Sequence, residues 1–225
     1  MPKEAIIKIK NVKKTYSTGE VAVRALLGIS LEIYRGDFLI IIGRNGSGKS
    51  TLLRQIGLLD IPDAGEIIIN DQNVVRISEK ERSEIRLKKL GYVFQDYALM
   101  SDLTAIENVM LPALMLEQTV NARKKAADLI EKVGLKNRID NLPSQLSGGE
   151  QQKVAIARAL VNNPEIIIAD EPTANLDSKA AKEVIEIFKK LNREGHTIVM
   201  VTHEEDEERS ASRIIELADG QILTG

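Results

Sequence analysis

The sequence predicts an α/β fold in which a parallel β-sheet core is interrupted by a helical lobe. Three short apolar runs, Phe38–Ile42, Ile166–Ala169 and Thr197–Thr202, are too compact for helices and are typical of strands buried on both faces. Between Asp96 and Ile166 the periodicity predicts amphipathic helices and no strand. We therefore expect a helical lobe inserted between the two halves of the core.

The first buried run leads directly into a glycine-rich loop and the start of a helix. Residues 43–51 read GRNGSGKST and match the pattern G-x-x-x-x-G-K-[ST]. The glycines let backbone N–H groups converge on phosphate oxygens, and the helix N-terminus adds positive potential. We expect Lys49 to reach the β- and γ-phosphates and the Ser50 hydroxyl to ligand Mg²⁺. The flanking strand and helix disfavour the alternative, a glycine turn with one solvated lysine.

Polar side chains follow the other strands at the point where each strand ends. Asp170 and Glu171 come directly after Ile166–Ala169, His203 follows Thr202, and Gln95 ends a short strand at Tyr92–Phe94. Ligands of α/β sheets bind at the carboxyl ends of the strands. We expect Asp170 to hold Mg²⁺, Glu171 to orient and deprotonate water, and His203 to contact the γ-phosphate. The alternatives are solvated loop acids and a structural histidine.

Two further features leave their function open when considered alone. Ser147-Gly148-Gly149-Glu150 is a capping box that opens a helix, and its glycines make it a second candidate anion site. A glycine-flexed cap with no ligand is the simpler interpretation. Tyr16, beside a turn, either stacks on a purine base or lies at a strand edge. Asp177 and Ser178 are expected to cap the next helix.

The flanking segments predict additional elements. Ala5–Val12 alternates as a half-buried strand does, and Val21–Ile33 is expected to hold two strands. Ser78–Lys89 predicts a charged helix with Gly91 as its C-cap.

The composition is that of an ordinary globular chain of 225 residues, with 43% hydrophobic and 28% charged residues. Thirty-one basic and 33 acidic residues leave it nearly neutral, so we expect no nucleic-acid partner. It has no cysteine, which suits a reducing compartment. The start, MPKEAIIKIK, does not have the pattern of a signal peptide, and no apolar run approaches about 18 residues. We therefore expect a cytoplasmic chain without a membrane span.

Six motifs occur in the order GRNGSGKST, VFQD, LSGGEQQKVAIARAL, IIIADEP, ANLDS and VTH. Together they resemble the ATP-binding cassette of ABC transporters over essentially the whole chain. The stretches FQDYALMSDLTAIENVMLP and DEPTANLDS are most similar to cassettes of lipoprotein-releasing and macrolide-efflux systems. Arg44 and Asn45 stand where Pro-Ser is expected in that phosphate loop, and Glu150 replaces the usual glutamine.

The resemblance implies a P-loop NTPase (RecA-like) core with an N-terminal antiparallel β subdomain and an inserted α-helical subdomain. The core would comprise residues 1–95 and 163–225 and the signature-bearing lobe residues 96–162, within a single ABC ATPase domain. Tyr16 would stack on adenine, and Gln95 would link Mg²⁺ and water to the lobe. Ser147, Gly148 and Gly149 would contact ATP bound to a partner protomer, and Asp177 would lie in the loop between the two sites.

The resemblance also implies a complete set of site residues. The catalytic residues would be Glu171, His203, Lys49 and Gln95, and the metal ligands would be Ser50, Gln95 and Asp170. The nucleotide would contact Tyr16, Gly43, Arg44, Asn45, Gly46, Ser47, Gly48, Lys49, Ser50, Thr51, Gln95, Ser147, Gly148, Gly149, Glu150, Asp177 and His203.

The function that the resemblance implies is ATP hydrolysis with Mg²⁺ in a homodimer that closes around two ATP molecules and drives a separate integral membrane permease. Such a subunit would lie on the cytoplasmic face of the cell membrane. The alternative is a soluble ABC ATPase with a role in cell division or in work on nucleic acid or ribosomes.

Overall fold

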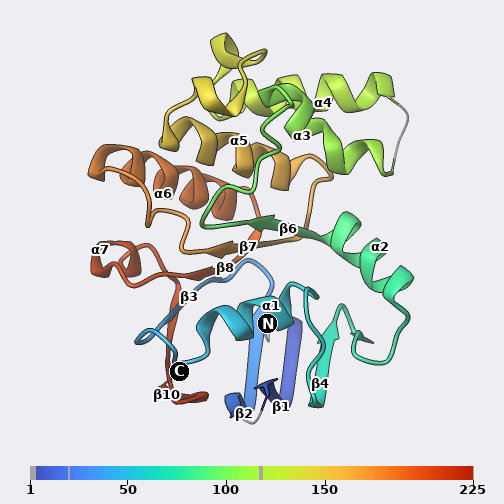
Figure 1. Cartoon of the computed structure of the whole chain (residues 1–225), viewed down its shortest axis with the longest axis vertical. Coiled ribbons are helices and arrows are strands. Elements are labelled where there is room, and N and C mark those ends of the chain that lie inside the picture. The colour runs from blue at the N-terminus through green and yellow to red at the C-terminus, as the bar shows by residue number, and fades with distance from the viewer. Residues whose placement is uncertain (1–3, 20, 117–118, 225) are drawn as a thin grey trace.

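Two β-sheets and the helices around them form the structure, a computed structural model that describes residues 4–19, 21–116 and 119–224 (Figure 1). The larger sheet has the strand order β10-β9-β3-β8-β7-β6. All neighbours from β9 to β6 are parallel, and β10 is antiparallel to β9. Its strands are β3 (Phe38–Ile42), β6 (Leu90–Val93), β7 (Ile166–Asp170), β8 (Thr197–Val201), β9 (Arg213–Ala218) and β10 (Gln221–Thr224).

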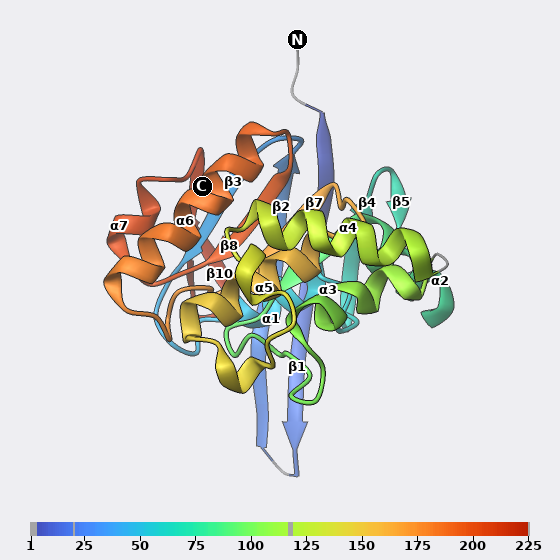
Figure 2. The same ribbon diagram turned by 90° about the horizontal axis from the view of Figure 1, so that it is seen from above.

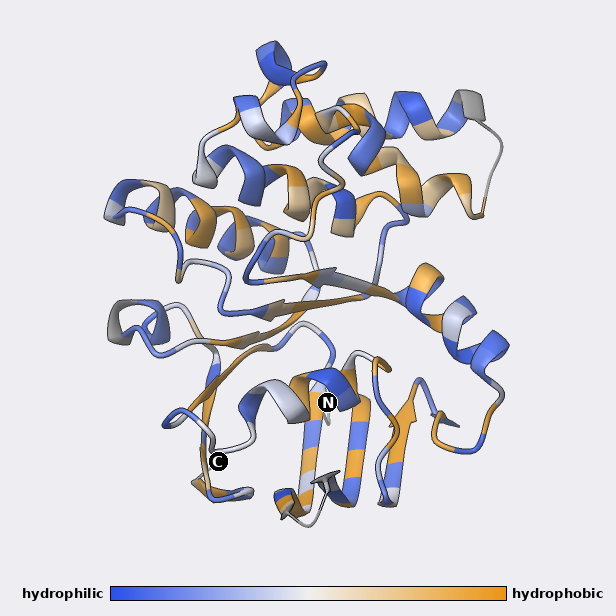
Figure 3. Ribbon diagram, in the orientation of Figure 1, coloured by the Kyte–Doolittle hydropathy of each residue, from blue (hydrophilic) through white to orange (hydrophobic). Residues whose placement is uncertain are grey.

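The smaller sheet is antiparallel and has the order β2-β1-β4-β5. Its strands are β1 (Ala5–Thr18), β2 (Val21–Tyr34), β4 (Ala64–Ile69) and β5 (Gln72–Asn73). Hydrophobic and hydrophilic residues alternate along β1 and β2, as expected for strands with one buried face (Figure 3).

Seven α-helices and two short 3₁₀ helices are present in the described ranges. They are α1 (Lys49–Ile56), α2 (Glu79–Lys89), α3 (Ala105–Leu114), α4 (Thr119–Lys132), η1 (Lys136–Arg138), η2 (Pro143–Gln145), α5 (Gly148–Leu160), α6 (Ser178–Arg193) and α7 (Glu205–Glu208). Within the described part of the chain, no helix is long and apolar enough to cross a membrane.

The parallel sheet buries a different core on each face. Leu39 and Ile41 of β3 face a cluster that includes α1 and the antiparallel sheet, whereas Phe38 and Ile40 face α5 and α6. This alternation is the period of two that a strand imposes. The strand is therefore buried on both sides, which fixes the loop that follows it.

Helices α3, α4 and α5 share a separate apolar cluster, and they form one group in Figure 2, with the β1–β2 hairpin extending beyond them. Helix α5 also contributes Ile156 and Leu160 to the core against the parallel sheet. The helix that begins with the Ser147-Gly148-Gly149 sequence is therefore packed into both parts of the molecule.

Two predictions about elements are wrong. Residues 21–34 form one continuous strand because Gly28 (φ 112°) faces a bulge in β1 at Asn11 (φ 48°). A Cβ atom at Gly28 would approach Asn11 Oδ1 to 2.7 Å, so this glycine permits the bulge and does not end the strand. Gly91 lies inside β6, and its missing side chain admits Ala159 O of α5; Leu90 caps α2 instead.

Candidate nucleotide site

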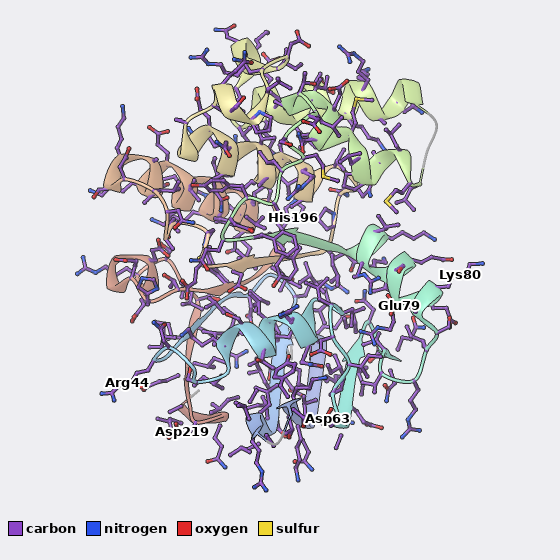
Figure 4. All side chains as sticks on the ribbon, viewed as in Figure 1. Arg44, Asp63, Glu79, Lys80, His196 and Asp219 are labelled. Carbon is purple, nitrogen blue, oxygen red and sulfur yellow. The ribbon has the colours of Figure 1, made fainter. Side chains whose placement is uncertain are left out.

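The loop between β3 and α1 is shaped for close backbone approach. Gly43 and Gly48 have φ values of 145° and 105°, and a Cβ atom on Gly43 would lie 2.1 Å from Leu217 O. Lys49 is 5% exposed, and its Nζ donates to Gly43 O at 2.7 Å and to Arg44 O at 3.1 Å. Arg44 points outward from the loop (Figure 4). The lysine therefore closes the loop upon itself, with its charge beside the first turn of α1.

The start of α1 offers donors at the same place. Its N-cap is Gly48, which has no capping side chain, and the first N–H groups of a helix have no acceptor within the helix. The loop positions 44 to 46 are exposed. A phosphate group at this mouth would meet several N–H groups, the helix dipole and Lys49.

Ser50 and Asp170 bring two oxygen donors together at the loop. Ser50 Oγ donates to Asp170 Oδ1 at 3.3 Å, so the first turn of α1 meets the end of β7. Burial raises the pKa of the Asp170 carboxyl, and the hydrogen bond from Ser50 and the charges of Arg54 and Lys49 oppose this shift. Hard oxygen donors are what Mg²⁺ prefers, and a cation would offset the cost of burying this carboxylate. The residues present fit Mg²⁺.

Glu171 and His203 meet at the ends of the neighbouring strands β7 and β8. The two residues lie 3.6 Å apart, measured from His203 Nδ1 to Glu171 Oε2, and the Glu171 side chain is 17% exposed. Glu171 has a left-handed backbone, φ 43°, and its N–H donates to Val201 O at 3.0 Å. A non-glycine residue in that region stores strain and persists only where its surroundings hold it.

Gln95 is exposed in the loop after β6, and a residue that the sequence did not single out fixes its backbone. Asn175 Nδ2 donates to Gln95 O at 3.1 Å, and Tyr97 Oη donates to Asn175 O at 3.5 Å. Asn175 belongs to the ANLDS motif, but nothing in the spacing indicated a contact 80 residues away in the chain.

Tyr16 lies in β1 and is held by residues that the sequence analysis missed. Its hydroxyl donates to Asp60 Oδ2 at 2.7 Å, Lys14 Nζ donates to Asp60 Oδ1 at 2.8 Å, and Lys14 Nζ lies 5.2 Å from the centre of the tyrosine ring. The two hydrogen bonds, against the opposing effect of burial, lower the pKa of the Asp60 carboxyl. Tyr16 is 37% exposed, so part of its ring stays accessible.

Replacing Asp60 with alanine should raise the KM for ATP by roughly three- to tenfold and leave kcat little changed. The expected size corresponds to losing the predicted stacking of Tyr16 on adenine, since an aromatic contact of this kind is worth about 0.5–1.5 kcal/mol. Steady-state phosphate release at varied ATP measures both constants. Asp71→Ala is the matched control, since Asp71 pairs with Lys8 on the same sheet at 3.3 Å, away from Tyr16. An unchanged KM would show that Asp60 does not hold the tyrosine for the base.

The Ser147 loop caps α5 and is packed against the start of α6. Ser147 and Glu150 form the expected capping box, and Arg138 Nε donates to Glu150 Oε1 at 3.3 Å. Cβ atoms on Gly148 and Gly149 would lie 2.8 Å from Tyr97 Oη and 2.7 Å from Ala180 Cβ. The two glycines therefore allow close packing. This packing is one explanation for their presence that does not require a bound ligand.

The predicted site residues fall into two groups. The phosphate loop, Asp170, Glu171 and His203 lie together at the carboxyl ends of the parallel strands, whereas the Ser147 loop lies at the start of α5. In Figure 1 the starts of α1 and α5 are separated by β7, β8 and α6. Asp177 lies near the second group, and its Oδ1 accepts from Lys179 N at 2.9 Å and Ala180 N at 2.8 Å as the cap of α6.

Comparison with known proteins gives the family. The family model described as ABC transporter matches residues 26–174. The ABC transporter ATP-binding protein MJ1508 of Methanocaldococcus jannaschii is 50% identical over 219 residues, which are 97% of this chain and 98% of that protein. The macrolide export ATP-binding/permease protein MacB of Chlorobaculum tepidum is 48% identical over 97% of this chain, which spans only 34% of MacB.

A solved structure agrees with these relatives. The ATP-binding cassette MJ0796, in a dimeric post-hydrolysis state bound to ADP and Pi, superposes with a TM-score of 0.91 at 44% identity, covering 97% of each chain. The α/β fold, the P-loop NTPase core and the resemblance to macrolide-efflux cassettes predicted from the sequence are therefore confirmed. The chain belongs to the ABC transporter family, as an ATP-binding cassette.

Proposed function

We propose that this cassette binds Mg-ATP at the Lys49 loop and hydrolyses it with Glu171 as the general base. One observation carries the proposal: the Ser50–Asp170 contact and the Glu171–His203 pair lie at adjacent strand ends beside the phosphate loop. In this reading Ser50 and Asp170 hold Mg²⁺, with Gln95 as a further ligand. The ion, when bound, neutralises charge on the β- and γ-phosphates.

Each site residue of this chain then has its own role in binding or hydrolysis. Lys49 exchanges its carbonyl partners for phosphate oxygens and stabilises the charge that develops on them. The Glu171 carboxylate orients water and accepts its proton as the water oxygen bonds to the γ-phosphorus and the bond from that phosphorus to the bridging oxygen of the leaving ADP breaks. His203 contacts the γ-phosphate from the neighbouring strand end and keeps it in line with that water. Tyr16 stacks on the adenine base.

Two protomers are proposed to share each nucleotide. In the Ser147 loop, Ser147 is exposed and the three residues after it are half-buried; the loop carries its own helix N-terminus and lies apart from the Lys49 loop of the same chain. A second protomer could bring its Ser147 loop, with Gly148, Gly149 and Glu150, to the open side of the phosphates. Asp177 would lie between the two sites. The dimeric MJ0796 cassettes among the structural neighbours support this arrangement.

A groove between α2, β6, α3 and α5 is the proposed docking site for a helix of a membrane permease. It has a volume of about 300 Å³ and is lined by apolar side chains, among them Tyr92 and Phe94, together with Arg86 and Arg158. Met115, which also lines this groove, is 70% exposed. A partly apolar groove that also contains two arginines suits an amphipathic helix. It adjoins the loop that carries Gln95, so docking there would couple the permease to the nucleotide site.

Replacing Met115 with glutamate should reduce co-sedimentation with permease-containing membranes by about tenfold or more, since a charge would be buried in the interface. Basal ATP turnover of the purified chain should stay within about twofold, because Met115 does not contact the site. Leu223→Glu is the control, at a side chain that is 58% exposed on β10. Unchanged sedimentation of the Met115 variant, or wild-type protein bound to ribosomes or DNA in place of membranes, would favour the non-transport role.

A further inference from the structure

We propose that Glu207 is a positioning residue for hydrolysis, which acts through Thr173 to hold the two catalytic loops at a fixed spacing. The inference rests on the proposed roles of Glu171 and His203. Thr173 and Glu207 are 6% and 5% exposed, and the Thr173 hydroxyl donates to Glu207 Oε1 inside the protein. The two residues come from different loops, 34 positions apart in the chain.

Each partner of this contact follows one member of the Glu171–His203 pair closely in sequence. Thr173 is two residues beyond Glu171 in the loop after β7, and Glu207 is four residues beyond His203 in the segment after β8. Side chains of the two loops thus meet twice: Glu171 and His203 lie 3.6 Å apart, and Thr173 is hydrogen-bonded to Glu207 in the interior. A buried hydrogen bond between the same two loops limits how far Glu171 and His203 can separate.

The loop after β7 is also fixed from its other side. Gln152 of α5 is fully buried, and its Nε2 donates to Pro172 O at 2.7 Å. Pro172 and Thr173 are therefore held between α5 and α7 by two buried side chains. This segment directly follows Glu171, whose φ of 43° needs such support to persist.

Packing alone does not account for a glutamate at position 207. Its Oε2 is buried and has no hydrogen-bond partner among the described residues. Burying a carboxyl group with one oxygen unpaired is costly, and an apolar side chain of similar size would fill the space at less cost. Compared with an apolar side chain, Glu207 adds the hydrogen bond to Thr173. The function of this bond is therefore to hold the catalytic loops at their spacing.

The test separates positioning from stability with four variants: Thr173→Val, Glu207→Leu, the two combined, and Glu207→Gln. For each, kcat and the KM for ATP are measured per mole of folded, ATP-binding protein, and the midpoint of thermal unfolding is recorded. Thr173→Val should lower kcat by about tenfold, within the range for a displacement of roughly 1 Å, with KM within about twofold. Glu207→Gln keeps a carbonyl acceptor for Thr173, so its kcat should remain within about threefold of wild type.

The double variant decides the question. Removing one partner of a buried hydrogen bond leaves the other unpaired, whereas replacing both with apolar groups is close to neutral for stability. The double variant should therefore regain the unfolding midpoint lost in Thr173→Val while its kcat stays about tenfold low. Recovery of kcat together with the midpoint would overturn the proposal, as would a wild-type kcat in Thr173→Val. A wild-type protein that does not hydrolyse ATP would instead refute the proposed function itself.

Discussion

Replacing Glu171 with glutamine is expected to lower ATP turnover by about 100-fold or more while leaving ATP binding intact. Glutamine keeps the size of the side chain and its hydrogen-bonding capacity but cannot accept the proton of the attacking water. Because the nucleotide contacts remain, the variant should accumulate as an ATP-bound dimer. Phosphate release and gel filtration with Mg-ATP measure the two effects.

Glu204→Gln is the matched control for this experiment. Glu204 Oε1 lies 3.4 Å from His203 Nε2, so it contacts the other nitrogen of the same imidazole ring, and it is 59% exposed. Turnover of the Glu204→Gln variant should remain within about twofold of wild type, since Glu204 lies at the other nitrogen-bearing edge of the ring, away from Glu171. Near-normal turnover in Glu171→Gln, or equal losses in both variants, would contradict the role assigned to Glu171.

The sequence predicts much of this fold because its strongest signals are local. Short apolar runs such as Phe38–Ile42 can be buried only in a sheet covered on both faces, and the capping box at Ser147 marks a helix start with two hydrogen bonds. The two wrong element predictions, two strands within Val21–Ile33 and a helix cap at Gly91, have one physical reason, which lies at Gly28 and Gly91. Each glycine is needed for a close contact with a distant segment, and a single sequence does not reveal such contacts.

Contacts between distant segments also limit what the sequence predicts about the site. Residues at strand ends were identifiable because every parallel strand ends at the same edge of the sheet. The sequence did not identify three residues that hold site residues in place, Asp60, Asn175 and Glu207. Each contacts a residue more than 30 positions away and lies in no phosphate or metal motif. The sharing of ATP between protomers stays a prediction, because it depends on a second copy of the chain.

Linked heterodimers test that sharing, with Lys49→Ala to disable the phosphate loop and Ser147→Arg to disable the signature loop. Both experiments use the Glu171→Gln background, in which bound ATP is not consumed. In the split pair each protomer carries one mutation. If the pocket is shared, both defects fall in the same pocket and the other pocket is complete. In the same-chain pair one protomer carries both mutations, and each shared pocket is then half disabled.

The most direct measurement is the amount of ATP that each purified, linked dimer retains after rapid removal of free nucleotide. A pocket built from the Lys49 loop of one protomer and the Ser147 loop of its partner predicts that the split pair retains ATP in one pocket, whereas the same-chain pair retains none. The unmutated pair in the same background should retain ATP in both pockets. A pocket contained within one protomer predicts the reverse order, and retention by the same-chain pair but not by the split pair would contradict the shared site.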